Sequence, residues 1–422
     1  MMEFGKLMGN EEMKRVRDAF YYMDEDANGT PRLFFDNAGG SYRLKKAEER
    51  FRKVDMIPDC SERNHEMALY LQSLEEAGKD DIRTIFNVKG GAIVTSLTAS
   101  QAMFQLVGAV AENIPGTNIV TTVLEHPSAF DAAGYYADQT GKELRVAKSN
   151  PDTGGVDAAE IAALIDQDTC LLSVMYSSNI SGAIFDIPGI IKAAKAIKPD
   201  LYIIVDAVQH TPHGVMDFSQ LDVDAVTFAP YKFFGVRGIG AAYISDRFSA
   251  LPHHKLAGKK KTEWELGSPA PAQYAMITEI VNYVCSLAAC QEKKGRRELF
   301  VEGMTKIMLQ ERALLYLMLE GTEQMQGLRH MEGVHVFMDN PDLEQRDLII
   351  GIGFDHIEYA AAVKEYEKRS VIVYERVASS LYSKRMLESF GLDGAIRVSP
   401  LHCNSKEEIE RFLAVTKEIA AL

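Results

Sequence analysis

Apolar residues recur in short runs through the first two thirds of the chain. These runs cover residues 118–124, 170–176, 201–208, 225–228 and 240–245, and they are rich in Val, Ile and Leu without strict alternation. Strands that are buried on both faces of a parallel sheet have this pattern. Helical patterns lie between some of them, at residues 158–165 and 187–197. Alternation of strand and helix predicts an α/β fold with a mostly parallel, doubly wound sheet.

The pattern changes in the last third of the chain. A long amphipathic stretch at residues 272–289 and a second one reaching residue 319 predict helices that leave the first domain. Strand patterns follow at residues 334–338, 347–354 and 370–374, with a helix at 357–368. Ser405 and Glu408 form a capping box before a final helical stripe. The sequence therefore predicts an N-terminal segment (1–30), a large α/β domain (31–290), and a linker helix with a small α+β domain (291–422).

Charge and composition narrow the class of protein. The 422 residues carry a formal net charge of -14, which disfavours binding to nucleic acid or to an anionic membrane. No apolar run is long enough to span a bilayer, and the first residues lack the pattern of a signal peptide. The five cysteines are scattered, without a CxxC pair or Cys/His cluster that would suggest a metal. We therefore expect a cytoplasmic protein without a bound metal.

Two of the predicted strands end in opposite charges. Asp206 closes the apolar run at 201–208, and Lys232 follows the run at 225–228. A buried ion pair, or two solvated loop charges, would explain either residue alone. Together they suit pyridoxal phosphate, which needs a lysine for its Schiff base and an acid at its pyridine nitrogen. Ligands bind outside the C-terminal ends of strands in such sheets, which is where both residues are expected.

Three further segments could complete such a site. Residues 95–101 are small and polar and open an apolar helix, whose N-terminus could bind a phosphate. His126 follows one strand, where its ring could stack on a cofactor, and Asn179 follows another. Each segment alone is more typical of a helix cap, a loop histidine and a turn asparagine. Their common position after strands or at a helix start favours the cofactor site.

These residues give the chain a resemblance to a known family. It resembles the class V aminotransferases of pyridoxal-phosphate fold type I, in the cysteine desulfurase-like branch. The resemblance extends from residue 34 to the C-terminal helix. It rests on residues 34–40, 125–126, 178–179, 205–209, 231–235, 238–240, 265–269 and 396–399.

The resemblance implies a role for each matching residue around the cofactor. Lys232 would form the Schiff base and move the α-proton, with Asp206 at the pyridine nitrogen and His126 on the ring face. The other cofactor contacts would be Gln209 and Asn179 near the phenolic oxygen, and Ala99, Ser100 and Gln101 at the phosphate.

The resemblance also implies substrate contacts and a partner. Arg397 would bind the substrate α-carboxylate, a bidentate task that suits a guanidinium, and Asn37 would lie near the substrate. Ser268 would reach the phosphate of a neighbouring subunit, which implies a homodimer with shared active sites. Arg376 is a candidate for a second cation that binds the substrate.

The chain departs from the family pattern at two places. Many members hold the phosphate with a serine and a histidine where this chain has Ala229 and Tyr231; the tyrosine hydroxyl could substitute, but the alanine cannot. Desulfurases also need a cysteine on a loop ahead of the arginine, and residues 374–383 contain none. Cys403 follows Arg397, and we expect it to be a packing residue.

Several functions therefore stay open. The main hypothesis is an enzyme that acts at the α-carbon of an amino acid, as an aminotransferase or as a carbon–sulfur lyase of the cystine or cysteine type. A cysteine desulfurase or an epimerase is the alternative within the family. A non-catalytic protein that binds pyridoxal phosphate, and an unrelated α/β binding protein, are the hypotheses outside it.

Overall fold

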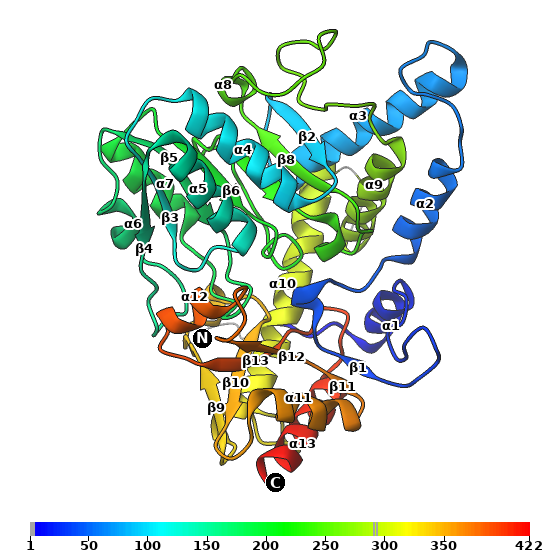
Figure 1. Cartoon of the computed structure of the whole chain (residues 1–422). Helices are drawn as coiled ribbons and strands as arrows, with labels where there is room; N and C mark the ends of the chain where they lie inside the picture. The colour runs from blue at the N-terminus through cyan, green and yellow to red at the C-terminus, as the bar shows by residue number, and fades with distance from the viewer. Residues whose placement is uncertain (1–4, 290–291, 293) are drawn as a thin grey trace.

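A seven-stranded sheet forms the centre of the larger part of the protein, with strand order β2-β8-β7-β6-β5-β3-β4. The computed structural model describes residues 5–289, 292 and 294–422 (Figure 1). Only β8 runs against its neighbours in this sheet, so the predicted mostly parallel α/β fold is confirmed. Its strands are β2 Ala92–Ser96, β3 Asn118–Thr122, β4 Glu143–Ala147, β5 Thr169–Met175, β6 Tyr202–Asp206, β7 Ala225–Phe228 and β8 Gly240–Ile244.

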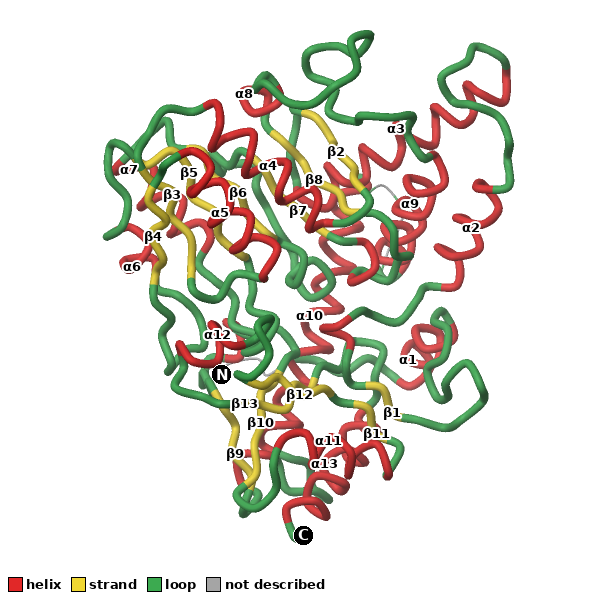
Figure 2. Tube along the Cα trace, viewed as in Figure 1, coloured by secondary structure: helices red, strands yellow, loops and turns green. Residues whose placement is uncertain are grey.

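Helices cover both faces of this sheet (Figures 1 and 2). Alternate residues of β6 join different clusters: Ile203 and Val205 pack in one apolar core, and Ile204 packs in another on the opposite face. Burial on both faces explains why the strands lack polar alternation. The covering helices include α3 Glu66–Phe86, α4 Ala99–Asn113, α5 Pro127–Thr140, α6 Ala158–Ala162, α7 Ile187–Ile197, α8 Asp246–Ser249 and α9 Pro271–Ser286.

A second sheet lies in the lower part of the molecule in Figure 1. The long helix α10 (Arg296–Glu320) leads to an antiparallel sheet of order β12-β13-β10-β9. Its strands are β9 Val334–Phe337, β10 Ile350–Phe354, β12 Tyr374–Val377 and β13 Gly394–Val398, and its helices are α11 Tyr359–Lys368, α12 Lys384–Ser389 and α13 Lys406–Ala420. The capping box of Ser405 and Glu408 forms at α13 as predicted.

One predicted strand is divided between two sheets. The run at 370–374 becomes β11 (Val371–Ile372), which pairs with β1 (Leu33–Phe34), and then β12 of the antiparallel sheet. Two more helices precede the large sheet in the chain: α1 Asn10–Asp18, and α2 Lys45–Asp55, which packs against α9 (Figure 1). The predicted domain limit at 290–291, Cys290 and the first four residues of the N-terminal segment lie outside the described residues.

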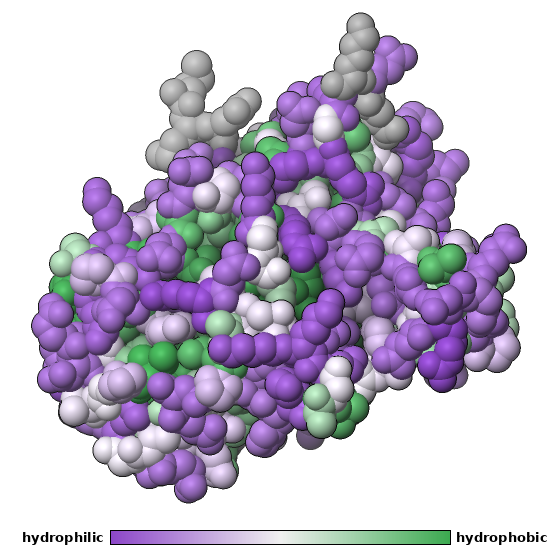
Figure 3. All heavy atoms as spheres, turned by 90° about the horizontal axis from the view of Figure 1, so that it is seen from above, coloured by the Kyte–Doolittle hydropathy of each residue, from purple (hydrophilic) through white to green (hydrophobic). Residues whose placement is uncertain are grey.

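The described part of the chain contains no helix that is both long and apolar enough to cross a membrane. Seen from above, the surface is largely hydrophilic, with hydrophobic patches set between polar side chains (Figure 3).

Candidate active site

Most of the predicted cofactor-binding residues meet at one edge of the large sheet. Asp206 ends β6, and Lys232 ends a short 3-10 turn (Pro230–Lys232) directly after β7. Because β8 is antiparallel, its first residue, Gly240, lies at the same edge as the C-terminal ends of β2 and β7. A cavity of about 200 Å³ opens there. Its lining includes Thr98, Ala99, Ser100, His126, Asn179, Asp206, Gln209, Tyr231 and Lys232.

The Lys232 amine is buried, and no acidic side chain of the described residues contacts it directly. Its Nζ donates to the Ala38 carbonyl at 2.8 Å and to Gln209 Oε1 at 3.2 Å. Among the described residues, no ion pair joins it to Asp206, so the alternative of a simple buried pair is not supported. Burial, followed by the charge of Arg397, lowers the pKa of Lys232 to about 7. An amine that loses its proton near neutral pH is available to attack an aldehyde.

Asp206 presents one carboxylate oxygen to the protein and leaves the other unbonded. Oδ1 accepts from the Val208 amide at 3.0 Å and from Thr227 Oγ1 at 3.4 Å. Within the described part of the chain no hydrogen bond occupies Oδ2. Burial raises the pKa of this carboxyl. A protonated ring nitrogen would supply the missing partner and favour the charged carboxylate.

His126 is held as a neutral ring. It caps α5, and its Nδ1 accepts from the Ser128 amide at 3.2 Å, which places the proton on Nε2. Burial, followed by the charges of Lys232 and Arg376, lowers the pKa of His126 to about 3. A neutral imidazole at this position can lie against an aromatic ring without repelling the nearby cations.

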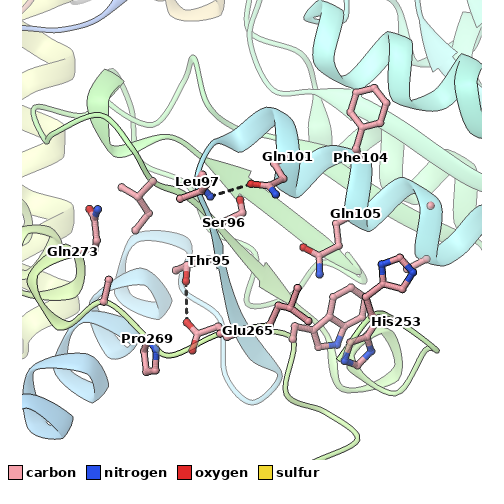
Figure 4. Close-up of a pocket in the computed structure, with 18 of the residues that line it drawn as sticks. Thr95, Ser96, Leu97, Gln101, Phe104, Gln105, His253, Glu265, Pro269 and Gln273 are labelled. Atoms are coloured by element: carbon pink, nitrogen blue, oxygen red, sulfur yellow. Dashed lines mark hydrogen bonds between the residues drawn. The ribbon is translucent and has the colours of Figure 1, made fainter. Parts of the chain in front are cut away.

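The first two residues at the predicted phosphate end, Ala99 and Ser100, line the cavity, but Gln101 turns away from it. Thr98 caps α4 by accepting from the Gln101 amide at 3.1 Å. The Gln101 side chain accepts from the Leu97 amide at 3.2 Å and lies in a neighbouring pocket of about 580 Å³ (Figure 4). A sequence pattern places a residue in a turn, but it does not predict which of two hollows receives the side chain.

Ser268 also lines this neighbouring pocket and not the cavity of Lys232. Its hydroxyl donates to Glu62 Oε2 at 2.7 Å, and the same oxygen is 3.8 Å from the thiol of Cys60. Figure 4 shows Glu265 from the segment just before Ser268, hydrogen-bonded to Thr95 of β2. Contact of Ser268 with the phosphate of a second subunit stays a prediction.

The two candidate substrate arginines come from the antiparallel sheet. Arg397 on β13 donates to Asp36 Oδ1 at 2.7 Å and to the Asn179 carbonyl at 3.2 Å, while its Nε has no partner. Arg376 on β12 donates to the Tyr382 carbonyl at 3.3 Å, and its buried Nε is also unpaired. Burial, followed by the charge of Arg397, lowers the pKa of Arg376 to about 10.

Asn37 has little hydrogen-bonding capacity left for a substrate. Its Nδ2 donates to the Ser399 carbonyl at 3.1 Å, and its Oδ1 accepts from the Tyr42 amide at 3.1 Å. These bonds fix the turn that presents the Ala38 carbonyl to Lys232. Cys403 is fully buried, as expected for a packing residue.

Sequence reasoning gave no role to a buried acid beside the site. Glu125 is fully buried, and its Oε1 accepts from Thr122 Oγ1 at 2.7 Å and from the Met175 amide at 3.0 Å. Burial raises the pKa of Glu125 to about 8, which favours the neutral carboxyl, and its hydrogen bonds tie the ends of β3 and β5 together. The sequence analysis counted residues 125–126 in the family resemblance but gave a role to His126 alone.

The arrangement fits pyridoxal phosphate. Asn179 Oδ1 is buried in the cavity wall and has no hydrogen-bond partner among the described residues. On the same cavity, Lys232 presents its amine and Asp206 presents the oxygen Oδ2, which is not hydrogen-bonded. A cofactor with an aldehyde, a phenolic oxygen and a basic ring nitrogen matches this set of groups. The helix N-terminus at Thr98–Ser100 offers amide donors for a phosphate.

The fold and the lysine–acid pair define the class of pyridoxal-phosphate enzymes of fold type I. The chain belongs to the class-V aminotransferase family, whose model matches residues 33–412. Membership implies pyridoxal 5'-phosphate as the cofactor.

Curated relatives with similar sequences are cysteine desulfurases. One from Pectobacterium carotovorum is 24% identical, covering 97% of this chain and 98% of the relative. A probable cysteine desulfurase from Mycoplasma genitalium is 25% identical, covering 91% of each chain. The apo structure of a cysteine desulfurase from Thermococcus onnurineus has a similar fold, with a TM-score of 0.80 at 20% identity over 99% of each chain. These findings favour the cysteine desulfurase alternative over an aminotransferase.

Proposed function

We propose that the protein uses pyridoxal phosphate to cleave the carbon–sulfur bond of cysteine or a cystine-type amino acid. The observation that carries the proposal is Lys232, a buried amine whose pKa is lowered to about 7, on one cavity with the free oxygen of Asp206. The names of the relatives support a sulfur-containing substrate over a general transamination.

Each residue of the proposed active site would have its own role. The cofactor, when bound, supplies a ring that withdraws electrons from the substrate α-carbon. Asp206 would keep the ring nitrogen protonated, and Lys232 would move the proton at the α-carbon. Arg397 would bind the α-carboxylate through its fork of donors, which requires that it share or release Asp36. Neutral His126 would lie against the ring face.

The sulfur leaves without a loop thiol in this proposal. Cysteine and water would give pyruvate, ammonia and hydrogen sulfide, a balanced reaction that needs no sulfur acceptor. A desulfurase would instead pass the sulfur to a thiol and release alanine. Among the described cysteines only Cys60 is partly exposed, and the others are buried. Among the described residues an acceptor thiol would therefore be Cys60, and an external thiol is the alternative.

An aminotransferase is the second candidate. The observation that favours it is the loop at residues 374–383, which has no thiol but places the Arg376 guanidinium near Lys232. Arg376 could bind an acidic side chain of an amino acid or keto acid. For either candidate we propose a cytoplasmic homodimer in which Ser268 reaches the neighbouring cofactor.

The test is a product analysis with the purified protein, pyridoxal phosphate and L-cysteine. Pyruvate, ammonia and sulfide in equal amounts support lysis. Alanine with sulfur on a thiol supports desulfuration. Stoichiometric bleaching of the visible absorption band without turnover supports transamination. The Lys232→Ala variant is the control and should be inactive, and a protein that binds no cofactor would refute the proposal.

A further inference from the structure

The phosphate end of the cavity lacks a polar side chain at Ala229 but gains a cation from another position. Arg237 lines the same cavity as Lys232, Thr98 and Ser100. It belongs to the connection between β7 and β8, and it precedes Gly240 by three residues. The sequence gives no helix after this glycine-rich connection, so a dinucleotide fingerprint does not explain it.

Two glycines hold the connection close to the cavity. A Cβ on Gly240 would lie 2.2 Å from the Ala99 amide nitrogen, so only glycine allows the start of β8 to touch the N-terminus of α4. A Cβ on Gly40 would lie 2.8 Å from Arg237 Nη2. The first contact brings the start of β8 to the N-terminus of α4, and the second places the Arg237 guanidinium against Gly40, in the cavity that Thr98 also lines.

Tyr231 supports the guanidinium from the side. Arg237 Cζ lies 4.4 Å from the centre of the Tyr231 ring, within the range of a cation–π contact. Among the described residues, Arg237 Nη2 donates a long hydrogen bond to the Gly39 carbonyl at 3.5 Å, and its side chain also forms a hydrogen bond with Tyr231. Most of its donors are therefore available to a ligand.

A second arginine adds positive charge without a carboxylate to balance it. Arg43 Nη1 donates to the Tyr231 carbonyl at 2.9 Å. Burial, followed by the charge of Arg237, lowers the pKa of Arg43 to about 10. In the part of the chain that the structure describes, neither guanidinium forms an ion pair. Arg237 therefore lines the cavity together with the N-terminus of α4, and Arg43, bonded to the Tyr231 carbonyl, adds a second cation near it.

We propose that Arg237 binds the phosphate group of pyridoxal phosphate, in place of the side chain that Ala229 cannot supply. The proposal rests on the proposed use of this cofactor. The planar guanidinium matches a phosphate dianion with two parallel donors. Tyr231 holds the guanidinium in position, and Arg43 adds long-range attraction.

The test compares two ligands that differ only in the phosphate. The apoprotein is titrated with pyridoxal phosphate and with pyridoxal, following absorbance, for the wild type, Arg237→Gln and Arg411→Gln. Arg411 lies on α13 and is the matched control, because its replacement removes the same charge from an exposed position far along the chain. Thermal melting of each apoprotein checks that the variants are folded.

The expected result is selective loss of phosphate binding. Arg237→Gln should raise the Kd of pyridoxal phosphate by about tenfold or more, because a charge-assisted hydrogen bond is lost. It should leave the Kd of pyridoxal within about twofold, as should Arg411→Gln for both ligands.

Two outcomes would overturn the inference alone. An unchanged Kd for pyridoxal phosphate in Arg237→Gln would show that the guanidinium does not bind the phosphate. An equal rise for both ligands would show that Arg237 only shapes the cavity. If the wild type binds neither ligand, the proposed function itself fails, and this result is distinct from the other two.

Discussion

Replacing Lys232 with methionine should stabilise the apoprotein at low pH, although the lysine is the central residue of the site. Methionine has a similar length and no charge. The structure keeps the amine buried, and its hydrogen-bond partners within the described chain are the Ala38 carbonyl and Gln209. Burial lowers its pKa from 10.5 to about 7. Between these two values the unfolded chain binds a proton that the folded protein does not bind, so stability rises with pH.

The lowered pKa sets the size of the effect. The two pKa values give a cost to the folded wild type of about 5 kcal/mol at about pH 6 and of about 2 kcal/mol at about pH 9. Methionine removes this cost at both pH values. It also removes two hydrogen bonds, each worth about 1 kcal/mol, at both pH values. The advantage of the variant over the wild type should therefore shrink by about 3 kcal/mol from low to high pH.

Urea unfolding of both apoproteins at the two pH values measures this difference. Lys417→Met, at an exposed position on α13, is the control, and its stability relative to wild type should not vary with pH because solvent surrounds this side chain in both states. A Lys232→Met difference that is also constant with pH would refute the reasoning, since it would mean that the folded protein holds the charged amine without cost.

Three further results are expected. Asp206→Asn should still bind the cofactor, as followed by absorbance, but its turnover, measured as product release, should fall by about 100-fold or more. The reason is that a neutral amide cannot hold the ring nitrogen protonated. Near-normal turnover would contradict the role of Asp206. Glu311→Ala should lower the free energy of unfolding, measured with urea, by about 3–5 kcal/mol. The reason is that His213 Nδ1 lies 2.7 Å from the Glu311 carboxylate in a buried pair. A loss under about 1 kcal/mol would mean that other residues can replace the pair. Gly303→Ala should lower the melting temperature, because its Cβ would lie 1.9 Å from a carbonyl oxygen of α9. Gly134→Ala is the control: its Cβ would meet nothing closer than 3.9 Å, so it should raise the free energy of unfolding by about 0.5–1 kcal/mol. Equal effects of the two variants would mean that α9 and α10 can move apart.

Five of the seven strands of the large sheet were predictable from the sequence, with the charges that follow two of them, whereas β2 and β4, at the two ends of the strand order, were not predicted. Burial on both faces leaves a continuous apolar run, and the run stops where the chain reaches the ligand edge. Asp206 and Lys232 stand out because each is a charge at the end of such a run. The same logic failed at residues 370–374, because one short apolar run serves two sheets and no local signal marks the change of partner.

The direction of side chains at the cavity was not predictable. Gln101 and Ser100 are adjacent at the start of α4, yet only Ser100 lines the cavity of Lys232. A hydrogen bond from the Leu97 amide holds the Gln101 side chain in the neighbouring pocket. This orientation depends on three-dimensional contacts that the sequence does not show. Glu125 was given no role for a similar reason, since a glutamate in a sequence gives no sign that it will be buried with a raised pKa.

Arg237 shows how a reversed strand changes the meaning of a local motif. In a parallel strand, a glycine-rich segment at the start would lie at the edge opposite the ligand. Because β8 is antiparallel, its first residues lie beside the C-terminal ends of β2 and β7. Gly240 then allows β8 to contact α4, and Arg237, three residues earlier, lines the cavity. The chain could therefore lose a polar side chain at Ala229 and still present a cation to the phosphate, since that cation comes from a different segment at the same edge.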